Sequence, residues 1–265
     1  MKLSKKTQCV LGLATFLSLS TQHANASFIT NVTESGLFSQ VYGLDIATNS
    51  DYNAGTPDYD INNTADDFGN VDRIGYYLEL DNSWMWVSFN SYTQDLTQIG
   101  VPVGSTSWQQ TIASMNVETN VAGITVGQGI TTGNVEFWSS CYATNNAAGV
   151  TSASSNIYDY GDQQDTQSCY GSMQIHNYGA QETLFAYNAW DHGLTDDLGI
   201  GNNTSNIHTD WTFTHNTSSY NVRRLEVFVS SQSIRDSAQS VSTPTTISLF
   251  LIGLIALVAR RKSKV

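Results

Sequence analysis

Side chains suited to sugar binding are concentrated between Gly133 and Trp211. Flat aromatic rings stack on the apolar face of a pyranose, and amide, carboxylate and imidazole groups hydrogen-bond its hydroxyls. The candidate ligand contacts in this segment are Trp138, Gln174, His176, Asn177, Trp190, Asp210 and Trp211. The alternative is that the tryptophans are core residues, because large rings dominate burial in any β-sandwich.

The same segment contains candidate acid–base groups, since a pair of carboxylates can hydrolyse glycosides. If the chain is an enzyme, the candidates are Glu136, His176 and Asp210, with Asp159 and Asp162 as further carboxylates. The sequence contains no Gly-x-Ser-x-Gly or His-Glu-x-x-His motif, and a lone histidine on a strand is more often structural. We therefore predict binding rather than catalysis, with no catalytic residue assigned.

An acidic loop could hold a structural calcium ion, and the sequence indicates no other cofactor. Asp58, Asp60 and Asn62 place oxygen ligands at alternate positions, as at the start of a calcium loop, and Asp66 and Asp67 could add ligands. Asn63 and Gly69 stand where an EF-hand needs glycine and glutamate, so that motif is excluded. A solvated turn of Asp and Asn, bonded to its own backbone, is the alternative.

The elements that would position these residues are β-strands, because apolar residues alternate with a period of two through most of the chain. The predicted strands are Leu37–Asp45, Arg73–Leu80, Trp84–Phe89, Ala113–Glu118, Gly133–Trp138, Gly171–His176, Thr183–Asn188 and Val222–Val229. Alternation places Ile74, Tyr76, Leu78 and Leu80 on one face of their strand, and likewise Leu225, Val227 and Val229, whereas Val41 and Tyr42 fall on opposite faces of the first strand. We expect an all-β fold, a single jelly-roll-like β-sandwich with long polar loops at 49–70 and 143–167. The glycines of Asp197–Asn202 indicate tight turns.

The charge and cysteine content of the chain restrict the molecules that it can bind. All 23 acidic residues but only four of the 11 basic residues lie between Ser27 and Ser240, so this part has a formal net charge of −19 and no lysine. Nucleic-acid binding is excluded because cations that would release counterions from phosphates are too few. Cys141 and Cys169 remain as an even pair in this part, which predicts a disulfide in an exported chain, with two buried thiols as the alternative.

Both ends of the sequence indicate export. Lys2, Lys5 and Lys6 precede an apolar core, and Ala24-Asn25-Ala26 is a typical cleavage site, so 1–26 is a predicted signal peptide. The β-sandwich domain is assigned to 27–230 and a Ser/Thr-rich linker to 231–246. The tail, 247–265, contains thirteen mostly apolar residues, fewer than the about 20 of a regular transmembrane helix, followed by a basic cluster. A weak membrane anchor is one interpretation.

The C-terminal residues Pro244, Gly253, Arg260 and Arg261 resemble the tripartite PEP-CTERM sorting tail, although one proline and no glutamate remain of its Pro-Glu-Pro motif. The resemblance implies transient or permanent membrane contact through the tail and processing by an exosortase-type enzyme. It also implies export across the inner membrane of a Gram-negative bacterium to the outer surface or extracellular matrix.

The segment Asp72–Val229 resembles an uncharacterised β-rich module of large secreted bacterial proteins, including some sialate O-acetylesterases. The resemblance rests on runs such as Gly133-Asn-Val-Glu-Phe-Trp138, Tyr170-Gly-Ser-Met-Gln-Ile-His-Asn177 and Asp197-Leu-Gly-Ile-Gly-Asn202. It implies an accessory sandwich near carbohydrate-active partners and no catalytic residues.

Three functions follow for an exported β-sandwich of this composition. The first is binding of an extracellular polysaccharide or other glycan at the cell surface or in the matrix. The second is a carbohydrate-active hydrolase, lyase or esterase, and the third is a structural or adhesive matrix protein.

Overall fold

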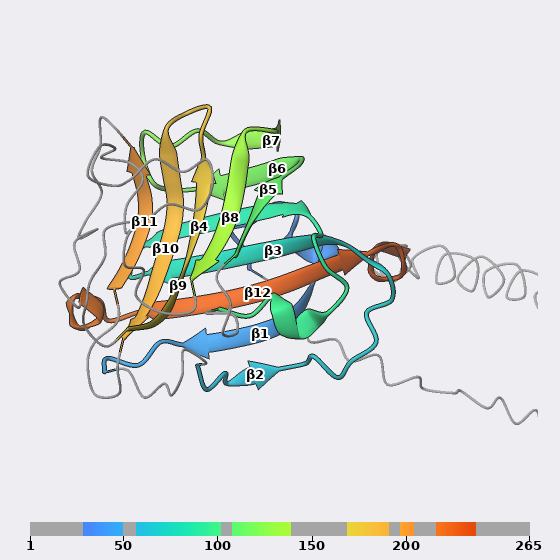
Figure 1. Cartoon of the computed structure of the whole chain (residues 1–265), viewed down its shortest axis with the longest axis horizontal. Helices are drawn as coiled ribbons and strands as arrows, with labels where there is room; N and C mark the ends of the chain where they lie inside the picture. Colours follow the sequence, from blue (N-terminus) through green and yellow to red (C-terminus); the bar gives the residue numbers. More distant parts are fainter. Residues whose placement is uncertain are drawn as a thin grey trace, which may run out of the picture.

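The chain folds into two antiparallel β-sheets that pack face to face, which confirms the predicted all-β sandwich (Figure 1). The computed structural model describes residues 29–49, 57–101, 108–138, 169–190, 197–203 and 216–236, and these are the described residues below. Their helical segments are short: η1 is Ser35–Leu37, η2 is Leu96–Gln98, η3 is Asn216–Ser219, and one further turn covers 232–236.

The larger sheet has the strand order β2-β1-β12-β3-β4-β6-β7. Its strands are β1 (Ser39–Asp45), β2 (Ile61–Asn62), β3 (Val71–Leu80), β4 (Ser83–Asn90), β6 (Met115–Thr119), β7 (Gly127–Ile130) and β12 (Arg223–Ser231). The last strand lies between β1 and β3, so segments far apart in the sequence pair at the middle of this sheet.

The smaller sheet has the order β11-β10-β9-β8-β5. Its strands are β5 (Trp108–Ile112), β8 (Gly133–Trp138), β9 (Cys169–Asn177), β10 (Glu182–Trp190) and β11 (Asp197–Asn203). Figure 1 shows β8 to β11 running steeply across β1, β12 and β3, so the sheets cross rather than align. The four strands β8 to β11 form a meander, which brings polar residues from successive segments side by side.

The hydrophobic core lies between the sheets and is built from alternate residues of each strand. The seven-stranded sheet contributes, among others, Ile74, Tyr76, Leu78 and Leu80 from β3 and Leu225, Val227 and Val229 from β12. These two predicted alternations are confirmed. The five-stranded sheet contributes Val135, Phe137, Met173, Ile175, Leu198 and Ile200. All of these side chains are at most 4% exposed, and removing such apolar area from water stabilises the fold by roughly 25 cal/mol per Å².

The predicted faces of the first strand are wrong. Regular alternation would place Val41 and Tyr42 on opposite faces, yet both belong to the core. The register with β12 shifts between Gln40 and Tyr42, and an extra residue at such a bulge breaks the alternation. The strand also begins at Ser39 rather than Leu37, because η1 takes up the residues before it.

Residues 29–38 cover part of the outer face of the seven-stranded sheet. Ile29, Val32 and Phe38 pack with Trp86, Tyr77 and Phe228 in a second hydrophobic cluster. Trp86 is buried, and its ring lies against Gly75, where an added Cβ would stand 2.3 Å from a ring carbon. Glu34 fixes the covering segment by accepting hydrogen bonds from Trp86 Nε1 at 2.7 Å and Asn116 Nδ2 at 2.9 Å.

Strands β2, β5, β7 and β11 are not among the predicted ones. Strands β5, β7 and β11 are Gln-, Gly- or Asn-rich, and all four lie at sheet edges, where less apolar surface is needed. The prediction of tight turns at Asp197–Asn202 is wrong, since Leu198 and Ile200 of β11 face the core. Gly201 does require glycine, because its φ is +71° and a Cβ would stand 2.9 Å from Val121.

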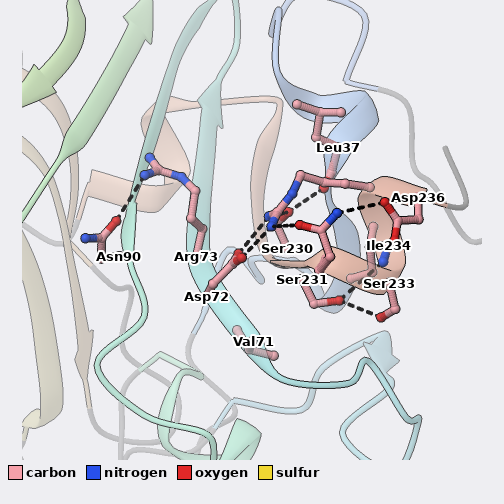
Figure 2. Close-up of polar contacts among 12 residues, drawn as sticks. Leu37, Val71, Asp72, Arg73, Asn90, Ser230, Ser231, Ser233, Ile234 and Asp236 are labelled. Atoms are coloured by element: carbon pink, nitrogen blue, oxygen red, sulfur yellow. Dashed lines mark hydrogen bonds and ion pairs between the residues drawn. The ribbon is translucent and has the colours of Figure 1, made fainter. Parts of the chain in front are cut away.

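The fold continues beyond the predicted domain end at residue 230. Strand β12 extends to Ser231, and the turn at 232–236 packs against the start of β3 (Figure 2). Arg235 Nη1 and Nη2 donate to the two carboxylate oxygens of Asp72 at 2.8 and 2.5 Å, and Arg235 also donates to Ser230 Oγ and Gln232 Oε1. Residues 231–236, predicted as linker, therefore belong to the folded domain.

The clamp between Asp72 and Arg235 gives a pH-dependent prediction. The hydrogen bond from Arg235 lowers the pKa of Asp72 from its usual 3.8. The clamp's contribution is therefore present above this usual pKa and is lost as the pH falls through the lower folded-state value. Asp72→Asn should lower the free energy of unfolding at neutral pH by only about 0.5–1 kcal/mol, because the Asp72 side chain is 42% exposed and water screens the pair.

Urea unfolding of the parent protein and of Asp72→Asn across the acid range measures this contribution. The difference between them should shrink at acid pH, whereas Asp66→Asn, a charge removal in an exposed loop residue, should leave stability nearly unchanged. A difference for Asp72→Asn that stayed constant down to strongly acid pH would contradict the clamp.

Candidate functional site

The outer face of the five-stranded sheet carries a set of polar side chains, Asn134, Glu136, Gln174, His176 and Thr183, which we call the polar face. Strand β8 provides the first two, β9 the next two and β10 the last. Asn134 pairs with His176, which in turn pairs with Thr183, and Glu136 pairs with Gln174. The residues thus form two adjacent cross-strand rows, although β8 is separated from β9 by residues 139–168.

The alternation of β8 and β9 explains why these residues share a face. Val135 and Phe137 point into the core from β8, as Met173 and Ile175 do from β9, so the residues between them face the other way. The polar face is nevertheless closed to solvent, since each of its five residues is at most 1% exposed. Buried polar groups of this kind cost free energy unless they are hydrogen-bonded, so their concentration marks this face as a candidate site.

The centre of the polar face is a histidine held by an amide and a carboxylate. His176 Nδ1 lies 2.9 Å from Asn134 Oδ1 and 3.7 Å from Glu136 Oε1, and the His176 ring stacks on Tyr178 with centroids 5.5 Å apart. Two oxygens beside Nδ1 favour a proton on that nitrogen, which makes Nε2 the basic nitrogen of the neutral ring. An imidazole oriented in this way by the Asn134 amide oxygen can accept or donate a proton, or bind a metal ion.

A second buried carboxylate, Glu182, lies on the inner side of the same sheet, opposite the polar face, and was not found from the sequence. Glu182 Oε1 accepts hydrogen bonds from the backbone N–H and the hydroxyl of Thr125 at 2.7 and 2.9 Å, and Glu182 Oε2 accepts from Asn177 Nδ2 at 3.3 Å. Asn177 Oδ1 in turn accepts from Thr132 Oγ1 at 3.2 Å. Asn177, a predicted ligand contact, therefore uses its side-chain amide within the fold, where it ties the β9–β10 connection to neighbouring loops.

The structure brings together only part of the predicted site. Glu136, Gln174 and His176 are neighbours on the polar face, as described above. Trp138 is the last residue of β8 and pairs with Ser172 of β9, and Trp190 is the last residue of β10 and pairs with Cys169 of β9. Both tryptophans therefore lie at the same end of the sheet. Asp159, Asp162, Asp210 and Trp211 lie outside the described residues, and so does Cys141, which leaves the disulfide with Cys169 a prediction.

The predicted calcium ligands lie at and beside β2. Asp60 Oδ2 accepts a hydrogen bond from the Asp45 N–H at 2.7 Å, Asn62 Oδ1 from the Thr64 N–H at 3.2 Å, and Asp67 Oδ1 from the Gly69 N–H at 2.9 Å. The contacts of Asn62 and Asp67 are the local side-chain-to-backbone bonds that the turn interpretation expects, whereas Asp60 bonds the backbone of β1. Among the described residues, His, Cys, Asp and Glu form no group of three suited to a metal ion, and calcium at Asp58, Asp60 and Asn62 stays a prediction.

The targeting segments are not described by the structure. The signal peptide and the sorting residues Pro244, Gly253, Arg260 and Arg261 lie outside the described ranges. Within those ranges, no helix combines the length and apolar character needed to cross a membrane. Export and tail processing therefore stay predictions from the sequence.

Comparison of the chain with protein-family models, with curated proteins and with solved structures finds no match in any of the three. The two resemblances drawn from the sequence thus stay untested. Function has to be inferred from the targeting signals and from the side chains that the fold brings together.

Proposed function

We propose that this chain is an exported, cell-surface or extracellular-matrix protein that binds a glycan through the outer face of its five-stranded sheet. The observation that carries the proposal is the cross-strand arrangement of Asn134, Glu136, Gln174 and His176, with tryptophans ending β8 and β10 at one end of the same sheet. Amide, carboxylate and imidazole groups in adjacent rows match the hydroxyls of a sugar ring. The two tryptophans supply the residue type that stacks on its apolar face.

The burial of the polar face sets a condition on the proposed binding. Glu136, Gln174 and His176 are each 0% exposed, so a sugar can reach them only if this face opens. A few convergent polar groups in a mostly enclosed setting are typical of small-ligand sites.

The targeting signals support the location of this activity. A signal peptide at 1–26 and a PEP-CTERM-like tail would send the sandwich through the inner membrane, with an exosortase-type enzyme as processing partner. The net charge of −19 between Ser27 and Ser240 suits a soluble extracellular domain and disfavours anionic polysaccharides.

Retention of the secreted protein on an array of neutral glycans tests the proposal. We expect Trp138→Ala, Trp190→Ala or Trp211→Ala to weaken binding at least about tenfold where the ring stacks on sugar. Val126→Ala, which shortens an exposed apolar side chain between β6 and β7, is the control and should bind normally. Failure of the parent protein to retain any glycan, or undiminished retention by all three variants, would contradict the proposal.

One observation favours a second candidate function, a carbohydrate-active hydrolase, lyase or esterase. Glu136 and His176, two of the three predicted acid–base residues, lie on one face with Glu136 Oε1 3.7 Å from His176 Nδ1. In this function Glu136 and Asn134 would hold the imidazole so that Nε2 takes up a proton from the attacking group. Asp210, the third candidate, lies outside the described residues.

Glu136→Gln tests this second function, because the change removes the charge and keeps the shape. We expect it to lower kcat for release of reducing ends or acetate by at least about a hundredfold, a typical acid–base contribution. Asp66→Asn provides the matched loss of a charge at an exposed site. A parent protein that binds glycans and releases no product would eliminate the enzymatic function and leave the binding proposal intact.

A further inference from the structure

The outer face of the seven-stranded sheet carries a row of charged and aromatic residues that could bind a ligand. The row consists of Asp45, Arg224, Glu79 and Trp84, and we call it the exposed row. Asp45 of β1 pairs with Arg224 of β12, Arg224 pairs with Glu79 of β3, and Glu79 pairs with Trp84 of β4. Directly paired residues of antiparallel strands point to the same side of a sheet, so the four side chains share one face. Figure 1 shows the strands that carry them side by side.

The exposed row is the part of this face that residues 29–38 leave uncovered. The next row along the strands, Glu226, Tyr77 and Trp86, is at most 3% exposed beneath that segment. In the exposed row Asp45 is exposed, the Arg224 side chain is 43% exposed, and Glu79 and Trp84 are partly exposed. A ligand can therefore reach these residues without any rearrangement of the fold.

Trp84 is held in place from several sides. Its ring packs on Tyr77, with centroids 6.3 Å apart and an interplanar angle of 29°. Its backbone N–H donates to Asn120 Oδ1 at 2.9 Å, its carbonyl accepts from Thr119 Oγ1, and Asn120 Nδ2 donates to the carbonyl of Asn82 at 2.6 Å. A side chain that is already ordered loses little conformational entropy when a ligand stacks on it.

The charge of the exposed row favours a cation. Arg224 forms an ion pair with Glu226, and Glu226 is 1% exposed, so the guanidinium charge is already balanced. Glu79, whose Oε2 accepts a hydrogen bond from Tyr77 OH at 3.3 Å, and the exposed Asp45 leave this row negative. A carboxylate next to an indole ring attracts an ammonium group through both its charge and the π-face of the ring.

We propose that the exposed row is a second glycan-binding site, specific for a polysaccharide of hexosamine units that carry free, protonated amines. Trp84 stacks on the sugar ring, Glu79 pairs with its ammonium group, and Asp45 attracts the next amine along the polymer. This site lies on the opposite outer face of the sandwich from the polar face, so it binds independently of the function proposed there. The net charge of −19 between Ser27 and Ser240 speeds the approach of a cationic polymer.

Binding of two oligosaccharides that differ only in charge tests the proposal. The probes are a β-1,4-linked glucosamine hexasaccharide and its fully N-acetylated counterpart, titrated by calorimetry into the full secreted protein at a mildly acidic pH. We expect the free-amine probe to bind at least about tenfold more tightly, with an affinity that falls as salt rises. Trp84→Ala should weaken its binding at least about tenfold, Trp84→Phe less, and Glu79→Gln should remove most of the preference for the free amine.

Matched controls separate this site from general electrostatic attraction and from the polar face. Asp66→Asn removes one exposed carboxylate elsewhere and should keep the preference, and Trp138→Ala should leave free-amine binding unchanged. Equal affinity for the two probes, an Asp66→Asn effect as large as that of Glu79→Gln, or full binding by Trp84→Ala would overturn the proposal. Loss of neutral-glycan binding in Trp138→Ala alone would concern only the polar face.

Discussion

The two-residue period of the strand side chains is the constraint on which both the core and the candidate site depend. Val135, Phe137, Met173 and Ile175 fill the space between the sheets. Once they point inward, the intervening residues of β8 and β9 must point outward, which places the polar residues side by side. A slip of one residue in β8 would move two core side chains onto the polar face and place Asn134 and Glu136 among apolar atoms. The same strand register therefore determines both the packing of the core and the assembly of the polar face.

The polar face is costly to maintain, which is the physical reason to regard it as functional. Removing polar groups from water costs free energy that hydrogen bonds inside the protein must offset, and removing a charge from water costs more. Glu182, Thr125 and Asn177 show how the neighbouring network satisfies such groups, since each donates or accepts within it. A sandwich that only needed stability would place exposed polar side chains on this face, where water would solvate them.

Local pattern was enough to predict much of the fold but not how its segments pair. The strands β3, β8 and β12 were predicted because apolar residues alternate along them without interruption. The bulge in β1 could not be predicted, since it depends on its partner β12, nearly two hundred residues away. Strand β11 was mistaken for turns because its glycines hide the apolar pair Leu198 and Ile200.

The site was predicted to a similar extent and for similar reasons. Residue types and alternation identified Glu136, Gln174 and His176, but only pairing of β8 with β9 shows that they meet. Glu182 was missed because its partner Thr125 comes from a loop more than fifty residues earlier. Glu79 and Trp84 gave no sequence signal beyond strand character, and their exposure depends on where residues 29–38 end on the sheet.

Hydrogen–deuterium exchange with and without a retained neutral glycan tests the central claim most directly. If the outer face of the five-stranded sheet binds the ligand, exchange should slow in β8 and β9, at Gly133–Trp138 and Cys169–Asn177, and stay unchanged in β3 and β12. Slower exchange confined to the seven-stranded sheet, or no change in β8 and β9 under saturating glycan, would contradict the claim.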